Sequence, residues 1–252
     1  MSFFQADNLS INFGGIKAVD GVTFDVDKGE VFTIIGPNGA GKTTIFNLVS
    51  RIYEPTGGQL TFDGMDITGV APHRVAALGI ARTFQNIELF EHATLLQNLL
   101  LARHAHKKSG FFSELLFLPS VRQMEVEHRE AVEKAIDFLD LQQYRDSFIV
   151  NLPYGVRKVT ELARALCTDP KLLLLDEPSS GLNVEETEDM AFWIQDIKNL
   201  LGITVLMVEH DMSLVSAVSD RVLALNYGRP IATGTPAEVQ ADPEVIRAYL
   251  GG

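Results

Sequence analysis

Apolar and polar residues alternate near the start of the chain and then give way to an apolar run. Residues 21–36, GVTFDVDKGEVFTIIG, alternate up to a turn at residues 28–30 and then run apolar into the glycine. Alternation is typical of a strand with one solvent-facing side, and the run predicts a strand buried on both faces, as in a parallel sheet. TTIFNLVSRIY, residues 43–53, has helical spacing. Residues 57–69 predict another strand and turn.

The pattern becomes helical between about residues 88 and 165 and then returns to alternating strands and helices. EVEHREAVEKAIDFLDL, residues 125–141, predicts a helix with one wet face. Two buried strands separated by a helix are predicted by KLLLLDEP, residues 171–178, and GITVLMVEH, residues 202–210. A closing hairpin is predicted over residues 221–236. Strand–helix–strand alternation implies βαβ units with right-handed crossovers. The sequence therefore predicts an α/β fold.

Charge and cysteine content narrow the class of protein. The 252 residues include 33 acidic and 21 basic ones, for a formal net charge of −12. This balance argues against nucleic acid as the main partner, because phosphate backbones bind a cationic face. The single cysteine, Cys167, has no disulfide partner and indicates inert packing in a reducing compartment. No secretory signal is visible, and the most apolar windows are far shorter than the ~20 residues that a membrane span needs.

The strongest chemical signal is GPNGAGKTT, which follows a predicted strand and precedes a predicted helix. It fits G-x-x-x-x-G-K-[ST], in which glycines let backbone amides surround phosphate oxygens and the helix N-terminus adds its positive end. Lys42 is predicted to contact the β- and γ-phosphates and Thr43 to offer its hydroxyl to Mg²⁺. The residues predicted to bind nucleoside triphosphate here are Gly36, Pro37, Asn38, Gly39, Ala40, Gly41, Lys42, Thr43 and Thr44.

Two further apolar runs end in titratable residues. In LLLLDEPSSG, Asp176 ends the strand and is predicted to hold Mg²⁺ through its water shell, while Glu177 is predicted to act as the general base on the attacking water. TVLMVEHD brings His210 to the place where the γ-phosphate would lie, so its imidazole can donate to phosphate or orient the water. Gln85, in ARTFQN, is predicted to link nucleotide and magnesium to the helical region.

These segments together resemble an ABC-type ATPase, the nucleotide-binding subunit of ATP-binding-cassette transporters, over nearly the whole chain. The resemblance rests on the order phosphate loop, Gln85, residues 152–156, Asp176-Glu177, residues 180–183 and His210. It implies a P-loop NTPase core, RecA-like with a mostly parallel sheet, an N-terminal antiparallel β subdomain and an inserted α-helical signature subdomain. The implied core is 1–87 and 160–252, and the helical subdomain is 88–159. Phe13 would stack on adenine, with Val19 packing nearby; the alternative for Phe13 is a core aromatic.

Three segments are similar to importer ATPases of the branched-chain amino-acid (leucine/isoleucine/valine) type, with urea and short-amide importers as relatives. They are GGIKAVDGV, GMDITG and HRVAALGIARTFQNIELF. This resemblance implies ATP and Mg²⁺ as cofactors and two membrane permease subunits as partners. It also implies a second ABC ATPase subunit, in a heterodimer or a homodimer, and indirectly an extracytoplasmic solute-binding protein. The chain would then be peripheral, on the cytoplasmic face of the inner or plasma membrane.

The signature segment, residues 152–156, departs from the family's Leu-Ser-Gly-Gly-Gln and has Leu-Pro-Tyr-Gly-Val. In the family this segment binds the γ-phosphate across a head-to-tail dimer, so Tyr154 and Gly155 would contact the partner's nucleotide. Pro153 removes a hydroxyl and a backbone N–H, and Val156 loses a polar contact. Losing one hydrogen bond to a charged phosphate costs roughly 1.5–3 kcal/mol. We therefore expect a weakened phosphate surface on an otherwise complete ATPase.

Two other classes of function remain open at this point. One is a soluble ABC ATPase that remodels a protein partner, as in iron–sulfur cluster assembly. The other is a non-hydrolysing ATP-dependent clamp, which the altered signature makes conceivable and which Glu177 and His210 count against.

Overall fold

The computed structural model describes residues 2–83, 87–103 and 119–250. The chain divides into two compact units, Met1–Gln85 with Lys171–Gly252, and Asn86–Pro170. The helix that follows the signature segment packs within the second unit. Each unit is described below by itself.

A four-stranded antiparallel sheet begins the first unit, in the order β2-β1-β4-β5. Phe4 of β1 lies opposite Val26 of β2 on one side and Phe62 of β4 on the other. Alternate residues of β1 are buried near its start, which matches a sheet with one wet face. The strands are β1 Phe4–Phe13, β2 Ile16–Val26, β4 Gly57–Phe62 and β5 Met65–Asp66.

A six-stranded sheet forms the rest of the core, in the order β10-β9-β3-β8-β7-β6. All its neighbouring strands run parallel except β10, which pairs antiparallel with β9. Every residue of β3, β7 and β8 is buried, as the apolar runs predicted. The strands are β3 Val31–Ile35, β6 Ile80–Arg82, β7 Leu172–Asp176, β8 Thr204–Val208, β9 Arg221–Asn226 and β10 Arg229–Gly234.

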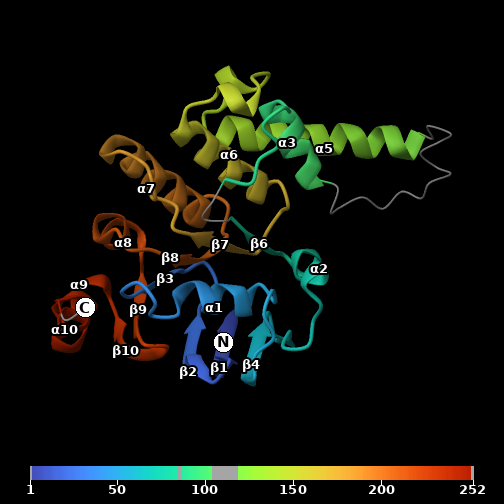
Figure 1. The fold of residues 1–252 in the computed structure, drawn as a ribbon. Coiled ribbons are helices and arrows are strands. Elements are labelled where there is room, and N and C mark those ends of the chain that lie inside the picture. The colour runs from blue at the N-terminus through green and yellow to red at the C-terminus, as the bar shows by residue number, and fades with distance from the viewer. Residues whose placement is uncertain (1, 84–86, 104–118, 251–252) are drawn as a thin grey trace. The chain divides into compact units, whose positions relative to one another are not determined.

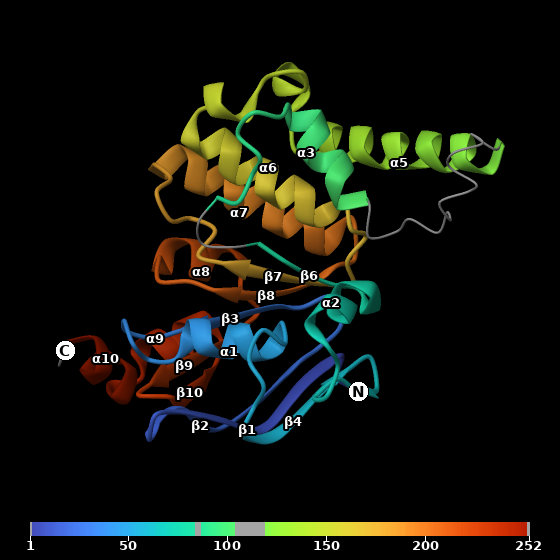
Figure 2. The same cartoon turned by 45° about the vertical axis from the view of Figure 1, so that its right-hand side comes forward.

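The helices of the first unit enclose the larger sheet. Helix α1 lies between the two sheets, and α7 and α8 cover the opposite face of the six-stranded sheet (Figure 1); Figure 2 shows the same layers from another side. Phe24 and Phe32 stack in the core with ring centroids 5.5 Å apart. The helices are α1 Lys42–Val49, α2 Pro72–Val75, η1 Ala76–Leu78, α7 Val184–Asn199, α8 Met212–Val218, α9 Pro236–Ala241 and α10 Pro243–Leu250.

The second unit is helical, as predicted for this part of the chain. Thr94 and Gln97 form a capping box at the start of α3, and α3, α5 and α6 pack on one another. Cys167 is the C-cap of α6 and is buried, and burial raises the pKa of its thiol to about 12, consistent with inert packing. The elements are α3 Leu95–Ala102, α5 Pro119–Phe138, η3 Gln142–Tyr144, η4 Ile149–Asn151 and α6 Tyr154–Leu166.

Within the described ranges, no helix combines the length and the apolar character that crossing a membrane requires. The mixed parallel sheet, the antiparallel sheet and the helical unit confirm the predicted α/β fold class.

Candidate functional site

The carboxyl ends of β3, β7 and β8 lie at one edge of the six-stranded sheet, because these strands are parallel neighbours. The phosphate loop follows β3, Asp176 ends β7, and His210 comes shortly after β8. Ligands of open α/β sheets bind at this edge. The fold therefore brings Lys42, Asp176, Glu177 and His210 to the same edge, as the sequence predicted.

Glycines of the phosphate loop stand where side chains would collide with the backbone. At Gly36, φ is +152°, and an added Cβ would lie 2.4 Å from the carbonyl oxygen of Leu225. At Gly41, φ is +100°, and a Cβ would lie 2.7 Å from the carbonyl oxygen of Ala18. The loop thus keeps its shape only with glycine at these two positions, and α1 begins directly after Gly41.

The turn between β9 and β10 supports the loop from another side, and the sequence analysis did not anticipate this contact. The Gly228 amide donates to the Ala40 carbonyl at 2.9 Å, and the Asp20 amide donates to the Gly228 carbonyl at 2.9 Å. Tyr227, beside it, also has a positive φ of 46°. The closing hairpin therefore joins the phosphate loop to β2.

Lys42 is buried, and its ammonium group is held by the loop itself. Nζ donates to the carbonyl oxygens of Gly36 at 2.6 Å and Pro37 at 3.2 Å. Burial lowers the pKa of Lys42, and the negative charges of Glu177, Asp176 and Glu209 oppose that shift. The phosphate loop thus holds the Lys42 ammonium group at its own backbone, where a positive charge can pair with a phosphate.

Asp176 is buried and forms an ion pair with Arg82, a residue that the sequence analysis did not single out. Arg82 Nη2 donates to Asp176 Oδ2 at 2.7 Å, while Nη1 of the same guanidinium donates to Asn47 at 2.7 Å and to Ser50 at 2.8 Å. The guanidinium also lies over the Phe46 ring at 5.6 Å. Arg82 therefore fixes Asp176 to α1, the helix that begins with Lys42.

The remaining oxygen of Asp176 fits a metal role. Oδ1 is buried and has no hydrogen-bond partner among the described residues. Thr43, whose hydroxyl was predicted to bind Mg²⁺, is exposed in the first turn of α1. Magnesium in nucleotide sites takes one or two protein oxygens and fills its shell with water and phosphate. Among the described residues, no group of three or more His, Cys, Asp or Glu side chains could hold a metal ion by itself.

Glu177 and His210 lie beside each other. Nδ1 of His210 is 3.7 Å from Oε2 of Glu177. The Glu177 backbone has φ +48°, and its amide donates to the Val208 carbonyl at 2.9 Å. A non-glycine residue at positive φ is uncommon and marks a constrained position. The histidine side chain is 56% exposed, so its imidazole can meet a ligand outside the protein surface.

A third acid, Glu209, lies behind this pair and was also absent from the predicted site. Its side chain is 0% exposed and accepts four hydrogen bonds, from Ser179 N, Ser179 Oγ, His210 N and Asp211 N. In the sequence, Glu209 is a polar residue directly after an apolar strand, and this pattern does not predict its hydrogen-bond partners.

The other predicted residues lie as follows. Phe13, at the end of β1, is 44% exposed, and its ring meets Tyr53 edge-on at 5.2 Å, so an aromatic face is open to a ligand. Val19 is fully buried in the core, close to Gly41. Asn183 caps α7 through a capping box with Glu186. Gln85 lies outside the described residues.

The signature segment belongs to the second unit. Pro153 is the N-cap of α6 and provides no side-chain cap, Tyr154 is 41% exposed, and Gly155 is buried in the first turn. The segment therefore leads directly into a helix N-terminus, the kind of backbone that suits an anion.

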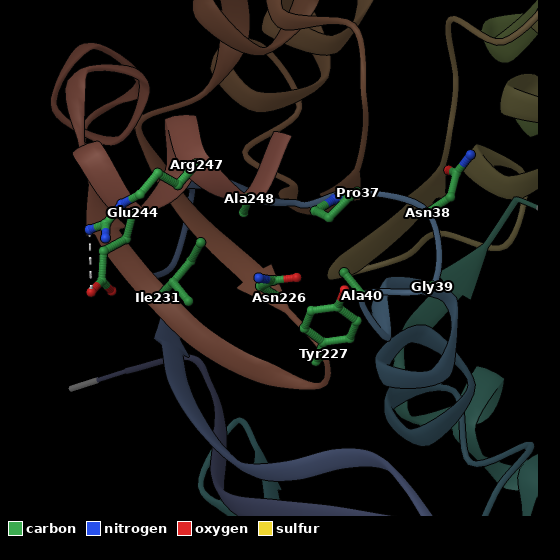
Figure 3. A pocket seen from close by; sticks show the side chains of 10 residues that line it. All are labelled: Pro37, Asn38, Gly39, Ala40, Asn226, Tyr227, Ile231, Glu244, Arg247 and Ala248. Atoms are coloured by element: carbon green, nitrogen blue, oxygen red, sulfur yellow. Dashed lines mark ion pairs between the residues drawn. The ribbon is translucent and has the colours of Figure 1, made fainter. Parts of the chain in front are cut away.

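The first unit also contains a cavity of about 350 Å³ beside the phosphate loop. Figure 3 shows Asn38 and Gly39 of the loop on one side, Tyr227 of the hairpin turn next to Ala40, and α10 on the other side. On α10, Arg247 Nη2 lies 4.0 Å from Glu244 Oε1, and both side chains are mostly exposed. The C-terminal helix thus lines one flank of the loop.

Comparison with known proteins gives the family. Residues 19–180 match the family described as ABC transporter, and residues 229–252 match the family described as Branched-chain amino acid ATP-binding cassette transporter. The chain belongs to the ABC transporter ATPases. This ABC ATPase is therefore an ATP hydrolase, in a family that binds ATP and ADP.

Individual relatives match over nearly the whole ABC ATPase chain. It is 42% identical over 250 residues to the high-affinity branched-chain amino acid transport ATP-binding protein BraF of Pseudomonas aeruginosa, with 98% of this chain and 97% of the relative covered. It is 40% identical over 247 residues to LivG of Escherichia coli, with 98% and 97% covered. A crystal structure of the ADP conformation of an ATP-binding cassette matches with a TM-score of 0.87 at 32% identity, over 100% of both chains. These relatives favour a transporter subunit over a remodelling ATPase or a clamp.

Proposed function

We propose that this ABC ATPase powers the uptake of branched-chain amino acids through two separate membrane permease subunits. The observation that carries the proposal is one sheet edge holding Lys42, Asp176, Glu177 and His210 in a chain whose near-full-length relatives are named for that transport. A solute-binding protein would deliver the amino acid, and the chain would sit peripherally on the cytoplasmic face of the membrane.

Each site residue has a role in this proposal. The loop from Gly36 to Thr44 binds the phosphates, with Lys42 against the β- and γ-phosphates and Phe13 stacked on adenine beside Val19. Thr43, Asp176 and Gln85 hold Mg²⁺, which when bound neutralises charge on the phosphate oxygens. Glu177 orients and deprotonates the attacking water, and His210 donates to the γ-phosphate. Hydrolysis then lets the ATPase dimer separate and resets the permease.

The substrate class is tested by stimulation of hydrolysis. We reconstitute the chain with its permeases, its second ATPase subunit and the binding protein, and measure Mg-ATP turnover with leucine or urea. Leucine should raise turnover severalfold over the solute-free rate, and urea should leave it unchanged. Stimulation by urea but not by leucine would move the chain to the urea and amide importers.

The altered signature leads to a prediction about asymmetry. In a head-to-tail dimer, Tyr154 and Gly155 complete the partner's site, while the site built on Lys42 and Glu177 uses the partner's signature. We therefore expect a heterodimer with one competent site on this chain and one impaired site across the interface. The double change Pro153→Ser/Val156→Gln should raise hydrolysis at the partner's site by at least about tenfold, since one charge-assisted hydrogen bond alone is worth roughly tenfold to a hundredfold.

The measurement is trapping of photoreactive ATP, with each subunit's labelling counted separately. Pro153→Ala is the matched control, because it restores the backbone N–H without the hydroxyl and so separates the two contributions. Near-equal hydrolysis at the two sites before any repair would refute the asymmetry. A homodimer that turns over well with Pro153 in place would make an asymmetric partner unnecessary.

A further inference from the structure

Glu209 is a fully buried carboxylate that joins two segments of the site. Oε1 accepts from the Ser179 amide at 2.9 Å and from the Ser179 hydroxyl at 2.6 Å. Oε2 accepts from the His210 amide at 2.6 Å and from the Asp211 amide at 3.1 Å. Both oxygens of one side chain are therefore used, one for each segment.

The two segments leave neighbouring strands. Asp176 of β7 pairs with Val208 of β8, so the chain after Glu177 and the chain after Glu209 start side by side. The backbone hydrogen bond from Glu177 N to Val208 O ends that pairing. Beyond it, Glu209 provides the contacts that keep Ser179 and His210 together.

The side chain of His210 also faces this acid. Its Nδ1 lies 3.5 Å from Glu209 Oε2 and 3.7 Å from Glu177 Oε2, so one nitrogen of the imidazole is close to both carboxylates. The electrostatic influence of Glu209 reaches Lys42 as well. A buried charge needs several donors to be stable, and a strand end that served packing alone would be satisfied by an apolar residue. Because burying the Glu209 carboxylate costs free energy, we infer that this side chain does more than fill space in the core.

We propose that Glu209 is a positioning residue that holds Glu177 and His210 in one fixed relation during hydrolysis. It acts through the segment at Ser179, two residues after the base, and through the backbone of His210. The inference rests on the proposed roles of Glu177 and His210. It adds that these residues act as a unit because a third side chain ties their segments together.

The first test is Glu209→Gln in the reconstituted ATPase complex. A glutamine keeps the size of the side chain but replaces one acceptor oxygen with an NH₂ donor. The hydrogen bonds to one of the two segments, at Ser179 or at His210 and Asp211, are then lost. We expect kcat to fall about tenfold to a hundredfold, the range for small misplacement of catalytic groups, while KM for ATP changes less than about threefold. Ser179→Ala removes one donor only and should give a smaller loss in the same parameter.

Glu30→Gln is the matched control for a merely structural effect. Glu30 is also buried and accepts from a backbone amide, Asp27 N at 2.6 Å, but it precedes β3 at the opposite end of that strand. This variant should lower thermal stability and leave kcat within about twofold, since no reacting group lies near it.

A double-mutant cycle with His210→Ala decides whether Glu209 acts through the histidine. If it does, Glu209→Gln should change the residual kcat of His210→Ala by less than about threefold, because coupled positions are non-additive. An equal loss in both backgrounds, or a kcat within twofold of wild type for Glu209→Gln, would overturn the inference. Undiminished turnover in Glu177→Gln and His210→Ala themselves would instead refute the proposed roles of those two residues.

Discussion

Glu177→Gln should lower Mg-ATP turnover by about 10²- to 10⁴-fold while ATP binding stays within a few-fold of wild type. The carboxylate is the only function removed, because glutamine has the same shape and can occupy the same backbone conformation at φ +48°. Lys42 and the glycines of the phosphate loop remain, so the binding contacts persist. Steady-state phosphate release and fluorescent-nucleotide titration measure the two quantities separately.

Glu185, an acid of α7, provides the control for charge alone. It is exposed in the first turn of α7, so Glu185→Gln removes the same charge without touching the site. Turnover should stay within about twofold, because exposed surface changes have small effects. Full activity in Glu177→Gln would show that another group activates the water and would remove the base from our account.

Arg82→Met should destabilise the protein by roughly 3–5 kcal/mol, because it leaves the buried Asp176 without its cation. The side chains of this pair are only 9% and 3% exposed, and the guanidinium also binds Asn47 and Ser50. Urea unfolding measures the change in the free energy of unfolding. The double variant Arg82→Met/Asp176→Asn should recover part of the loss, since the uncompensated charge is then gone.

Arg145→Met is the surface counterpart of this change. Arg145 pairs with Glu133 in the second unit, but the two side chains are 32% and 36% exposed. We expect it to lower the free energy of unfolding far less than Arg82→Met does, because water screens an exposed ion pair. Similar losses for Arg82→Met and Arg145→Met would contradict the view that Arg82 fixes Asp176 to α1.

Local patterns in the sequence were sufficient for the strands and the loop. The apolar runs of β3, β7 and β8 match strands with every residue buried, and the loop glycines match positions where a Cβ cannot fit. Both patterns are local, because burial on two faces and positive φ each restrict the residues of a short segment.

The supporting residues could not be predicted because their partners are distant in the sequence. Arg82 reaches Asp176 across 94 positions, and Glu209 reaches Ser179 across 30. In the sequence each is a single charged residue at a strand end, which usually means solvation. Only the strand order, with β6, β7 and β8 adjacent, shows that these charges face the site. The hairpin over residues 221–236 was predicted, but the hydrogen bond from the Gly228 amide to Ala40 depends on β9 lying next to β3.

The central claim is that hydrolysis on this chain drives amino-acid uptake, and uptake into proteoliposomes tests it most directly. The vesicles would contain the permeases, this chain and its second ATPase subunit, with Mg-ATP supplied to the ATPase side and labelled leucine with its binding protein on the other. We predict ATP-dependent accumulation of leucine that stops when Glu177→Gln is introduced into this chain alone. Accumulation at the wild-type rate with that variant would contradict the account.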